Sequence, residues 1–141
     1  LWDHSLRVGM LSKNIARSLS LPKDQVDMAF SAGLLHDLGK LVLAENYSMK
    51  YYSAIGLAKR KGVPLEAAEQ EIFGVSHGQI GAYLVGIWGL TDNTVQAAGS
   101  HHNQIHANED IDKTLATSKS NQKANKIIKP LIKPKNTNTS V

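Results

Sequence analysis

The chain has 141 residues, 42% of them hydrophobic and 6% aromatic, which is enough for one globular domain with a mainly aliphatic core. It contains no cysteine, so disulfides, iron–sulfur clusters, zinc ribbons and thiol nucleophiles are excluded, and any bound metal must take nitrogen and oxygen ligands. No apolar run approaches the roughly 18 residues of a membrane-spanning helix and no segment resembles a signal peptide, so we expect a cytoplasmic protein.

Charge divides the chain into two parts. Residues 1–112 hold nine Lys and Arg and twelve Asp and Glu, whereas residues 113–141 hold seven Lys and no acid. We expect residues 1–112 to form a helical domain and residues 113–141 to be a flexible, mostly disordered basic tail. The tail lacks aromatic residues for base stacking, which limits it to weak, unspecific contact with nucleic acid. Because the sequence begins at Leu1, we also expect an upstream domain in a longer protein.

The first expected helix follows the candidate N-cap Asp3. Apolar residues and one histidine then recur at helical spacing, namely His4, Val8, Leu11, Ile15 and Leu19. This pattern predicts that His4 lies on the inward face of the helix.

The second expected helix is opened by Pro22, which suits a first helical turn. Residues 28–35 are apolar on all sides of this helix, which is typical of the centre of a bundle. The same helix is expected to carry His36 and Asp37. Burying such a polar pair in the core is costly unless both side chains have hydrogen-bonding or charged partners there.

Helix start and stop residues predict four further helices. We expect one over residues 49–61 ending at Gly62, one over 65–73 between Pro64 and Gly74, one from a Ser76–Gln79 capping box to Trp88, and one from Thr91 to His101 and His102. The predicted fold class is therefore all-α, a bundle of about six helices.

Five histidines and one aspartate form a candidate metal site: His4, His36, Asp37, His77, His101 and His102. A neutral imidazole offers one lone pair and a carboxylate offers two oxygens, so this set can hold one divalent ion or bridge two. Glycines on either side of the His36–Asp37 pair, Gly33 and Gly39, remove side chains and would let other helices approach closely.

Plainer interpretations exist for the same residues. A single histidine on an apolar stripe is more often a hydrogen-bonded core residue than a ligand, although five together favour a shared site. His77, His101 and His102 lie at predicted helix ends, where solvent can satisfy an imidazole, so the two interpretations are balanced there. His106 is expected at the surface.

Asp37 and Lys40 are the candidate catalytic residues. Lys40 follows Asp37 by three residues and shares its helical face, where an ammonium group could lie over a metal-bound phosphate. An equally weighted alternative is that Lys40 complements the C-terminal end of its own helix.

Several segments resemble the HD superfamily, and most closely its HDOD type. They are residues 2–6 (WDHSL), 33–40 (GLLHDLGK), 73–82 (FGVSHGQIGA), 88–90 (WGL) and the pair 101–102 (HH). The resemblance implies an HD-type helical bundle with metal-dependent phosphohydrolase or phosphodiesterase ancestry. It also implies a role in bacterial signal transduction, with a regulatory or receiver domain or another signalling protein as partner.

Matched position by position, the resemblance implies that His4, His36, Asp37, His77, His101 and His102 bind one or two divalent ions such as iron or manganese. Two departures from related phosphodiesterases weigh against activity, because no GYP motif follows the double histidine and no acid follows Asp112. The N-terminal helical half usual in HDOD proteins is missing from residues 1–112 as well.

Two functions remain open at this point. The first is a metal-dependent phosphohydrolase acting on a phosphoester, and the second is a non-catalytic signalling or scaffold module that acts through protein contacts. The histidine set favours a bound metal, and the two departures favour the scaffold. No membrane partner is expected.

Overall fold

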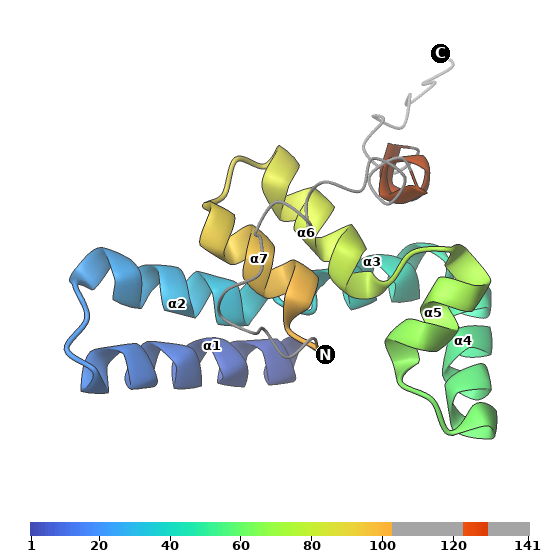
Figure 1. Cartoon of the computed structure of the whole chain (residues 1–141), viewed down its shortest axis with the longest axis horizontal. Helices are drawn as coiled ribbons and strands as arrows, with labels where there is room; N and C mark the ends of the chain where they lie inside the picture. The colour runs from blue at the N-terminus through green and yellow to red at the C-terminus, as the bar shows by residue number, and fades with distance from the viewer. Residues whose placement is uncertain (103–122, 130–141) are drawn as a thin grey trace, which may run out of the picture.

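The computed structural model describes residues 1–102 and 123–129, and within these ranges the chain is helical, with no strand (Figure 1). The helices are α1 (Trp2–Ser18), α2 (Lys23–Leu35), α3 (Leu38–Asn46), α4 (Ser48–Lys61), α5 (Leu65–Phe73), α6 (His77–Ile87) and α7 (Asp92–Ser100). The all-α prediction is confirmed. None of the described helices combines the length and apolarity that crossing a bilayer requires.

The expected second helix is in fact two helices, α2 and α3. α2 ends at Leu35, and Asp37 has φ −101° and ψ 12°, outside the regular helical range, before α3 begins at Leu38. His36 and Asp37 therefore form a junction between helices and do not lie within one helix. The bend turns both side chains toward the interior of the bundle, which side chains one residue apart on a continuous helix do only with difficulty.

Helix start and stop signals in the middle of the chain predicted the helix boundaries there well. α4 and α5 end at Gly62 and Gly74, both in the left-handed conformation that glycine adopts without a steric penalty. The Ser76 side chain accepts from the Gln79 backbone N–H, while the Gln79 side chain accepts from the Ser76 backbone N–H. This capping box fixes the start of α6, and with it the position of His77 in the first turn.

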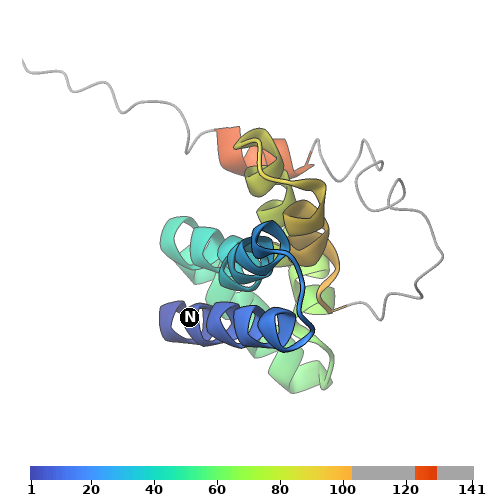
Figure 2. The same cartoon turned by 90° about the vertical axis from the view of Figure 1, so that its left-hand side faces the viewer.

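α1 and α2 run side by side and pack through small residues (Figures 1 and 2). The buried residues of α1 are Ser5, Gly9 and Ala16. A Cβ atom on Gly33 of α2 would lie 2.8 Å from the Cα of Gly9, so the two backbones touch at this crossing. The close approach that we expected at Gly33 is therefore present.

The apolar stripe predicted to face the core lies instead on an open flank of α1, which corrects the prediction. Leu11, Ile15 and Leu19 are 60%, 51% and 65% exposed, because close backbone packing on α2 uses small residues and turns large side chains outward. The His4 side chain is 60% exposed as well. Asp3 lies inside the first turn of α1 and is not its N-cap.

α3, α6 and α7 cross closely in the centre of the molecule. A Cβ atom on Gly39 of α3 would overlap the backbone carbonyl of His77, and one on Gly78 of α6 would lie 3.1 Å from the carbonyl oxygen of Ala98 in α7. Glycines at the crossings thus hold Asp37, the start of α6 and the end of α7 near one another.

The main apolar core lies beside this crossing and includes a segment from the basic tail. Residues 123–129 form a helix whose Ala124 and Ile128 are 1% exposed and pack with Leu43, Ile80 and Leu84. Figure 2 shows this segment, in red, against α6. The expectation of a disordered tail is therefore wrong for residues 123–129, where a short apolar face inside a Lys-rich sequence is sufficient for packing. The rest of the tail lies outside the described residues.

Candidate metal centre

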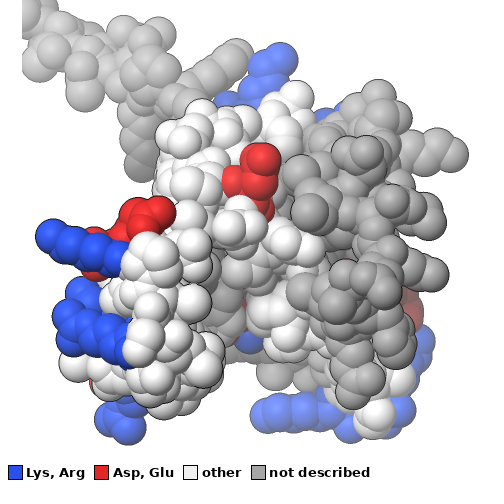
Figure 3. All heavy atoms as spheres, turned by 60° about the vertical axis from the view of Figure 1, so that its left-hand side comes forward, with Lys and Arg blue, Asp and Glu red and all other residues white. Residues whose placement is uncertain are grey.

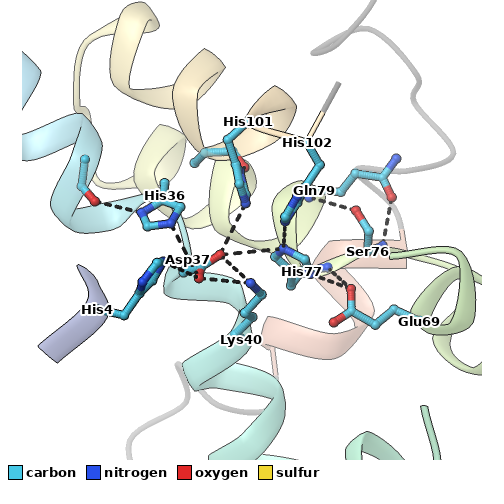
Figure 4. A network of polar contacts seen from close by, with 12 residues as sticks. His4, His36, Asp37, Lys40, Glu69, Ser76, His77, Gln79, His101 and His102 are labelled. Carbon is cyan, nitrogen blue, oxygen red and sulfur yellow. Dashed lines mark hydrogen bonds and ion pairs between the residues drawn. The ribbon is translucent and has the colours of Figure 1, made fainter. Parts of the chain in front are cut away.

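Asp37 is the centre of the polar cluster that α1, the α2–α3 junction, α6 and α7 build together (Figure 4). It is 2% exposed, and imidazole nitrogens from four histidines lie around its carboxylate. The distances from their Nε2 atoms to the nearest carboxylate oxygen are 3.2 Å for His101, 3.5 Å for His36, 3.7 Å for His77 and 3.8 Å for His4. The histidines that are far apart in the sequence are therefore brought together around one acid.

The two oxygens of this carboxylate face different histidines. Oδ2 lies toward His4 and His36, whereas Oδ1 lies toward His77 and His101. His102 joins the second group, because its Nε2 is 3.0 Å from Nε2 of His77. In each group, one ligand atom per residue can be chosen so that all lie within 4.8 Å of one another, with Asp37 common to both. The cluster therefore contains two groups of residues, each of which could hold a metal ion, and they share the Asp37 carboxylate.

Three of the imidazoles are held through their other ring nitrogen. Nδ1 of His36 lies 2.7 Å from the carbonyl oxygen of Gly33, and Nδ1 of His101 lies 3.0 Å from that of Ala98. A carbonyl oxygen only accepts, so each Nδ1 must carry the proton and donate it. The Nε2 atoms that point at Asp37 then keep their lone pairs, which is the protonation state a metal ligand needs.

The third of these imidazoles, His77, is held by a residue that the sequence reasoning missed, Glu69 of α5. Its Oε2 accepts from the backbone N–H of His77 at 2.8 Å and from Nδ1 of the same residue at 2.6 Å. Glu69 and His77 are 0% and 1% exposed, so solvent does not satisfy this imidazole, contrary to the plainer interpretation. The signal in the sequence was a glutamate on the buried stripe of α5, next to Ala68.

Two buried polar atoms support the fit of a cation to this cluster. Within the described part of the chain, Nε2 of His101 forms no hydrogen bond, and Oδ1 of Asp37, 3.2 Å away, is ion-paired with Lys40 but forms no hydrogen bond of good geometry. Buried polar atoms without a hydrogen bond are rare, and a bound ion is one established reason for them. Two lone pairs that face the same small space are what a metal ion would satisfy.

Lys40 is bound to Asp37 itself. Its Nζ lies 2.9 Å from Oδ2 and 2.9 Å from Oδ1 of that residue. It occupies the first turn of α3, so the alternative that it complements a helix C-terminus is wrong. Lys40 compensates the charge of the buried carboxylate, as burial of an acid requires.

Electrostatics keep Asp37 ionised and two of the histidines neutral. Burial alone would raise the pKa of Asp37, but the neighbouring His101, Lys40 and His36 outweigh it and hold that pKa well below its usual value. Burial lowers the pKa of His36 and of His102, and nearby imidazoles, chiefly His101, lower both further. An ionised carboxylate and a neutral imidazole are the protonation states in which these side chains bind a divalent cation.

The histidines of the cluster differ in their exposure. His4 and His102 are exposed, whereas His36, His77 and His101 are largely covered by the surrounding helices. Within the described residues, His4 and His102 are therefore the members of the cluster that are nearest to solvent. His106, Asp110 and Asp112 lie outside the described residues.

Comparison with known protein families adds the context for this geometry. The HDOD domain family matches residues 1–104, which include every residue of the cluster. This chain belongs to the HDOD family. The HDOD domain is related to the HD superfamily, as the sequence resemblance implied.

One curated relative of the HDOD domain is an uncharacterized protein of Treponema pallidum (strain Nichols), 28% identical over 119 residues. The match covers 83% of the present chain and 23% of the relative. No solved structure matches the chain.

Proposed function

We propose that this HDOD domain binds two divalent cations, iron, manganese or a similar metal, and hydrolyses a phosphoester in a bacterial signalling protein. The observation that carries the proposal is the split environment of Asp37, whose two oxygens face two different sets of imidazole lone pairs. A carboxylate shared between two cation sites is the arrangement expected for two-ion phosphoryl chemistry.

The residues of the cluster fit divalent metal ions. His4, His36 and Oδ2 of Asp37 would hold one ion, and His77, His101, His102 and Oδ1 of Asp37 would hold the other. Bound divalent ions would lower the pKa of a water molecule and polarise a phosphoryl oxygen.

The chain's own residues prepare the site for this chemistry. Glu69 and the carbonyls of Gly33 and Ala98 fix the ring orientation of three ligands, so little reorganisation is needed on binding. With cations on Asp37, the ammonium group of Lys40 would be released from that carboxylate and could contact a substrate phosphate. The partner is proposed to be a regulatory or receiver domain elsewhere in the same signalling protein.

Hydrolysis of bis(p-nitrophenyl) phosphate with added Mn²⁺ tests the catalytic part of the proposal. We expect measurable turnover that His36→Ala abolishes and that Glu45→Ala, at an exposed position of α3, leaves unchanged. No turnover with Mn²⁺, Fe²⁺, Co²⁺ or Mg²⁺ in a protein shown to contain metal would refute catalysis while leaving metal binding intact.

A second candidate function is a non-catalytic signalling scaffold. The specific observation in its favour is the Lys40–Asp37 pair, because it balances the buried charge and lets the fold persist without an ion. The missing GYP motif and the lack of any acid after Asp112 point the same way. A metal-free wild-type chain with the same melting temperature as the chain loaded with Mn²⁺ would favour this function.

A further inference from the structure

A groove between α1 and α2 lies away from the metal centre. Two adjoining depressions of about 360 and about 400 Å³ share Lys13 and Arg17 as lining residues. The first is lined by Leu6, Met10, Lys13, Asn14, Arg17 and Phe30, and the second extends it past Lys23 and Asp27. None of these residues belongs to the His–Asp cluster.

The floor of this groove is apolar and open. Leu6 and Met10 are 40% and 55% exposed, and Phe30 of α2 lies between the two helices. Of the twelve large hydrophobic residues exposed in the described part of the chain, eight lie within residues 1–21. Apolar surface concentrated in this way marks an interaction site more often than scattered single residues do.

The rim of the groove is basic. Lys13, Arg17 and Lys23 line it against a single acid, Asp27, and Lys13 reaches Asp27 at 3.6 Å while also lying over the Phe30 ring. Arg17 has no ion-pair partner among residues 1–102 and 123–129. Figure 3 shows one side of the molecule with basic side chains, acidic side chains next to some of them, and uncharged surface beside both.

We propose that this groove binds an acidic amphipathic helix of a partner protein. The lining residues of α1 span Leu6 to Arg17, about 17 Å along the helix axis, which is the length of about three helical turns. The apolar stripe of such a helix would cover Leu6, Met10 and Phe30, and acidic residues beside the stripe would pair with Arg17 and Lys23.

Two other occupants fit less well. In a symmetric dimer through the groove, Lys13 and Arg17 would meet the same surface of the second copy, which places like charges together. A bilayer would have to cover the outer crest of α1, where Asp3 and Arg7 form an exposed ion pair at 3.0 Å. Covering that exposed ion pair with a bilayer would remove two charges from water, which favours a helix packed into the groove over a flat membrane surface.

The test uses a fluorescein-labelled 15-residue peptide with leucine at helical spacing and glutamate beside the stripe, measured by fluorescence anisotropy. A scrambled peptide and one with lysine in place of glutamate serve as ligand controls. We expect the acidic peptide to bind the wild-type chain at least about tenfold more tightly than either control, a ratio typical of lost anchors or reversed charges.

Variants assign the binding to the groove. Met10→Glu should weaken the acidic peptide about tenfold, and Arg17→Glu should reverse the preference toward the lysine peptide. Ile15→Glu is the matched control, because Ile15 is 51% exposed on the same helix but does not line the groove. Far-UV circular dichroism and melting temperature check that each exposed substitution leaves the fold intact.

Several results would overturn the proposal. Equal affinity for the scrambled peptide, or loss of binding in Ile15→Glu and not in Met10→Glu, would remove the groove from the interaction. Concentration-dependent dimerisation lost in Met10→Glu, without peptide binding, would assign the surface to a second copy. Binding to phosphatidylserine vesicles without peptide binding would assign it to a membrane.

Discussion

Gly39 is the residue at which the fold of the metal centre is most sensitive to one added methyl group. It lies in the second position of α3, directly under the first turn of α6. A Cβ atom there would overlap the backbone carbonyl oxygen of His77 and lie 3.0 Å from the backbone nitrogen of Gly81. Both neighbours are backbone atoms of a helix, so neither can rotate away, and α3 and α6 must move apart.

The expected loss of stability follows from two opposed effects. Alanine gains at most about 1 kcal/mol over glycine from helix propensity. Overpacking costs about 1–3 kcal/mol when side chains can yield, and a backbone clash should lie at or above the upper end. We therefore expect Gly39→Ala to destabilise the domain by about 2 kcal/mol, which corresponds to a fall in melting temperature of about 8–16 °C for a domain of this size.

Gly56→Ala is the matched control for this substitution. Gly56 is within α4, and a Cβ there meets only the end of the flexible Arg60 side chain, at 3.3 Å. Because alanine has a higher helix propensity than glycine, Gly56→Ala should raise the stability of the domain by about 0.5–1 kcal/mol. Thermal and urea unfolding followed by circular dichroism measure both variants. A Gly39→Ala protein as stable as the wild type would refute the close α3–α6 crossing and the site geometry that depends on it.

Two further predictions concern the polar cluster. Glu69→Gln should weaken metal affinity about 10–100-fold, because the ring of His77 loses its charged partner. Calorimetric titration measures the affinity, and Glu71→Gln, at an exposed position, is the control. Equal affinities of the two variants would contradict the role of Glu69 in orienting His77. Burial lowers the pKa of His36 and of His102 below 6.5, so the unfolded chain binds more protons as the pH falls through that value. Stability of the metal-free chain, measured by urea unfolding, should therefore fall between about pH 7.5 and 5.5, and His36→Gln should reduce the slope; a rise on acidification would show that the sign is wrong. Because the pKa of Asp37 is lowered, its contribution to stability should be lost only in stronger acid, below its ordinary 3.8.

Local signals in the sequence predicted most of the helix boundaries. The glycines after α4 and α5 and the capping box at Ser76 act within a few residues, so their effect does not depend on the rest of the fold. The break between α2 and α3 was missed because no glycine or proline marks it. The backbone of Asp37 leaves the helical conformation there, and its carboxylate contacts residues from other helices, such as His101.

The inward face of α1 could not be predicted from its hydrophobic pattern. That pattern assumes that large apolar side chains are the buried ones, whereas contact between Gly9 and Gly33 makes small residues the packing face. His4 reaches Asp37 for a different reason from the one predicted, since it extends from the exposed end of α1 over the carboxylate.

The candidate site residues lie together as the sequence pattern indicated, whereas their supporting contacts were not predicted. Repeated histidines and the HDOD resemblance pointed to all six candidate ligands, and the structure groups the five histidines with Asp37. Glu69 was missed because its role depends on α5 packing against the start of α6, a contact that spacing along the chain does not encode.

Metal stoichiometry tests the central claim most directly. Protein purified without chelator and loaded with Mn²⁺ or Fe²⁺ should contain about two ions per chain by elemental analysis, as expected for two cation sites bridged by one carboxylate. Asp37→Ala should lose both ions, whereas His36→Ala and His101→Ala should each lose one. A wild-type chain that retains no stoichiometric metal, or an Asp37→Ala chain that retains two ions, would contradict the account.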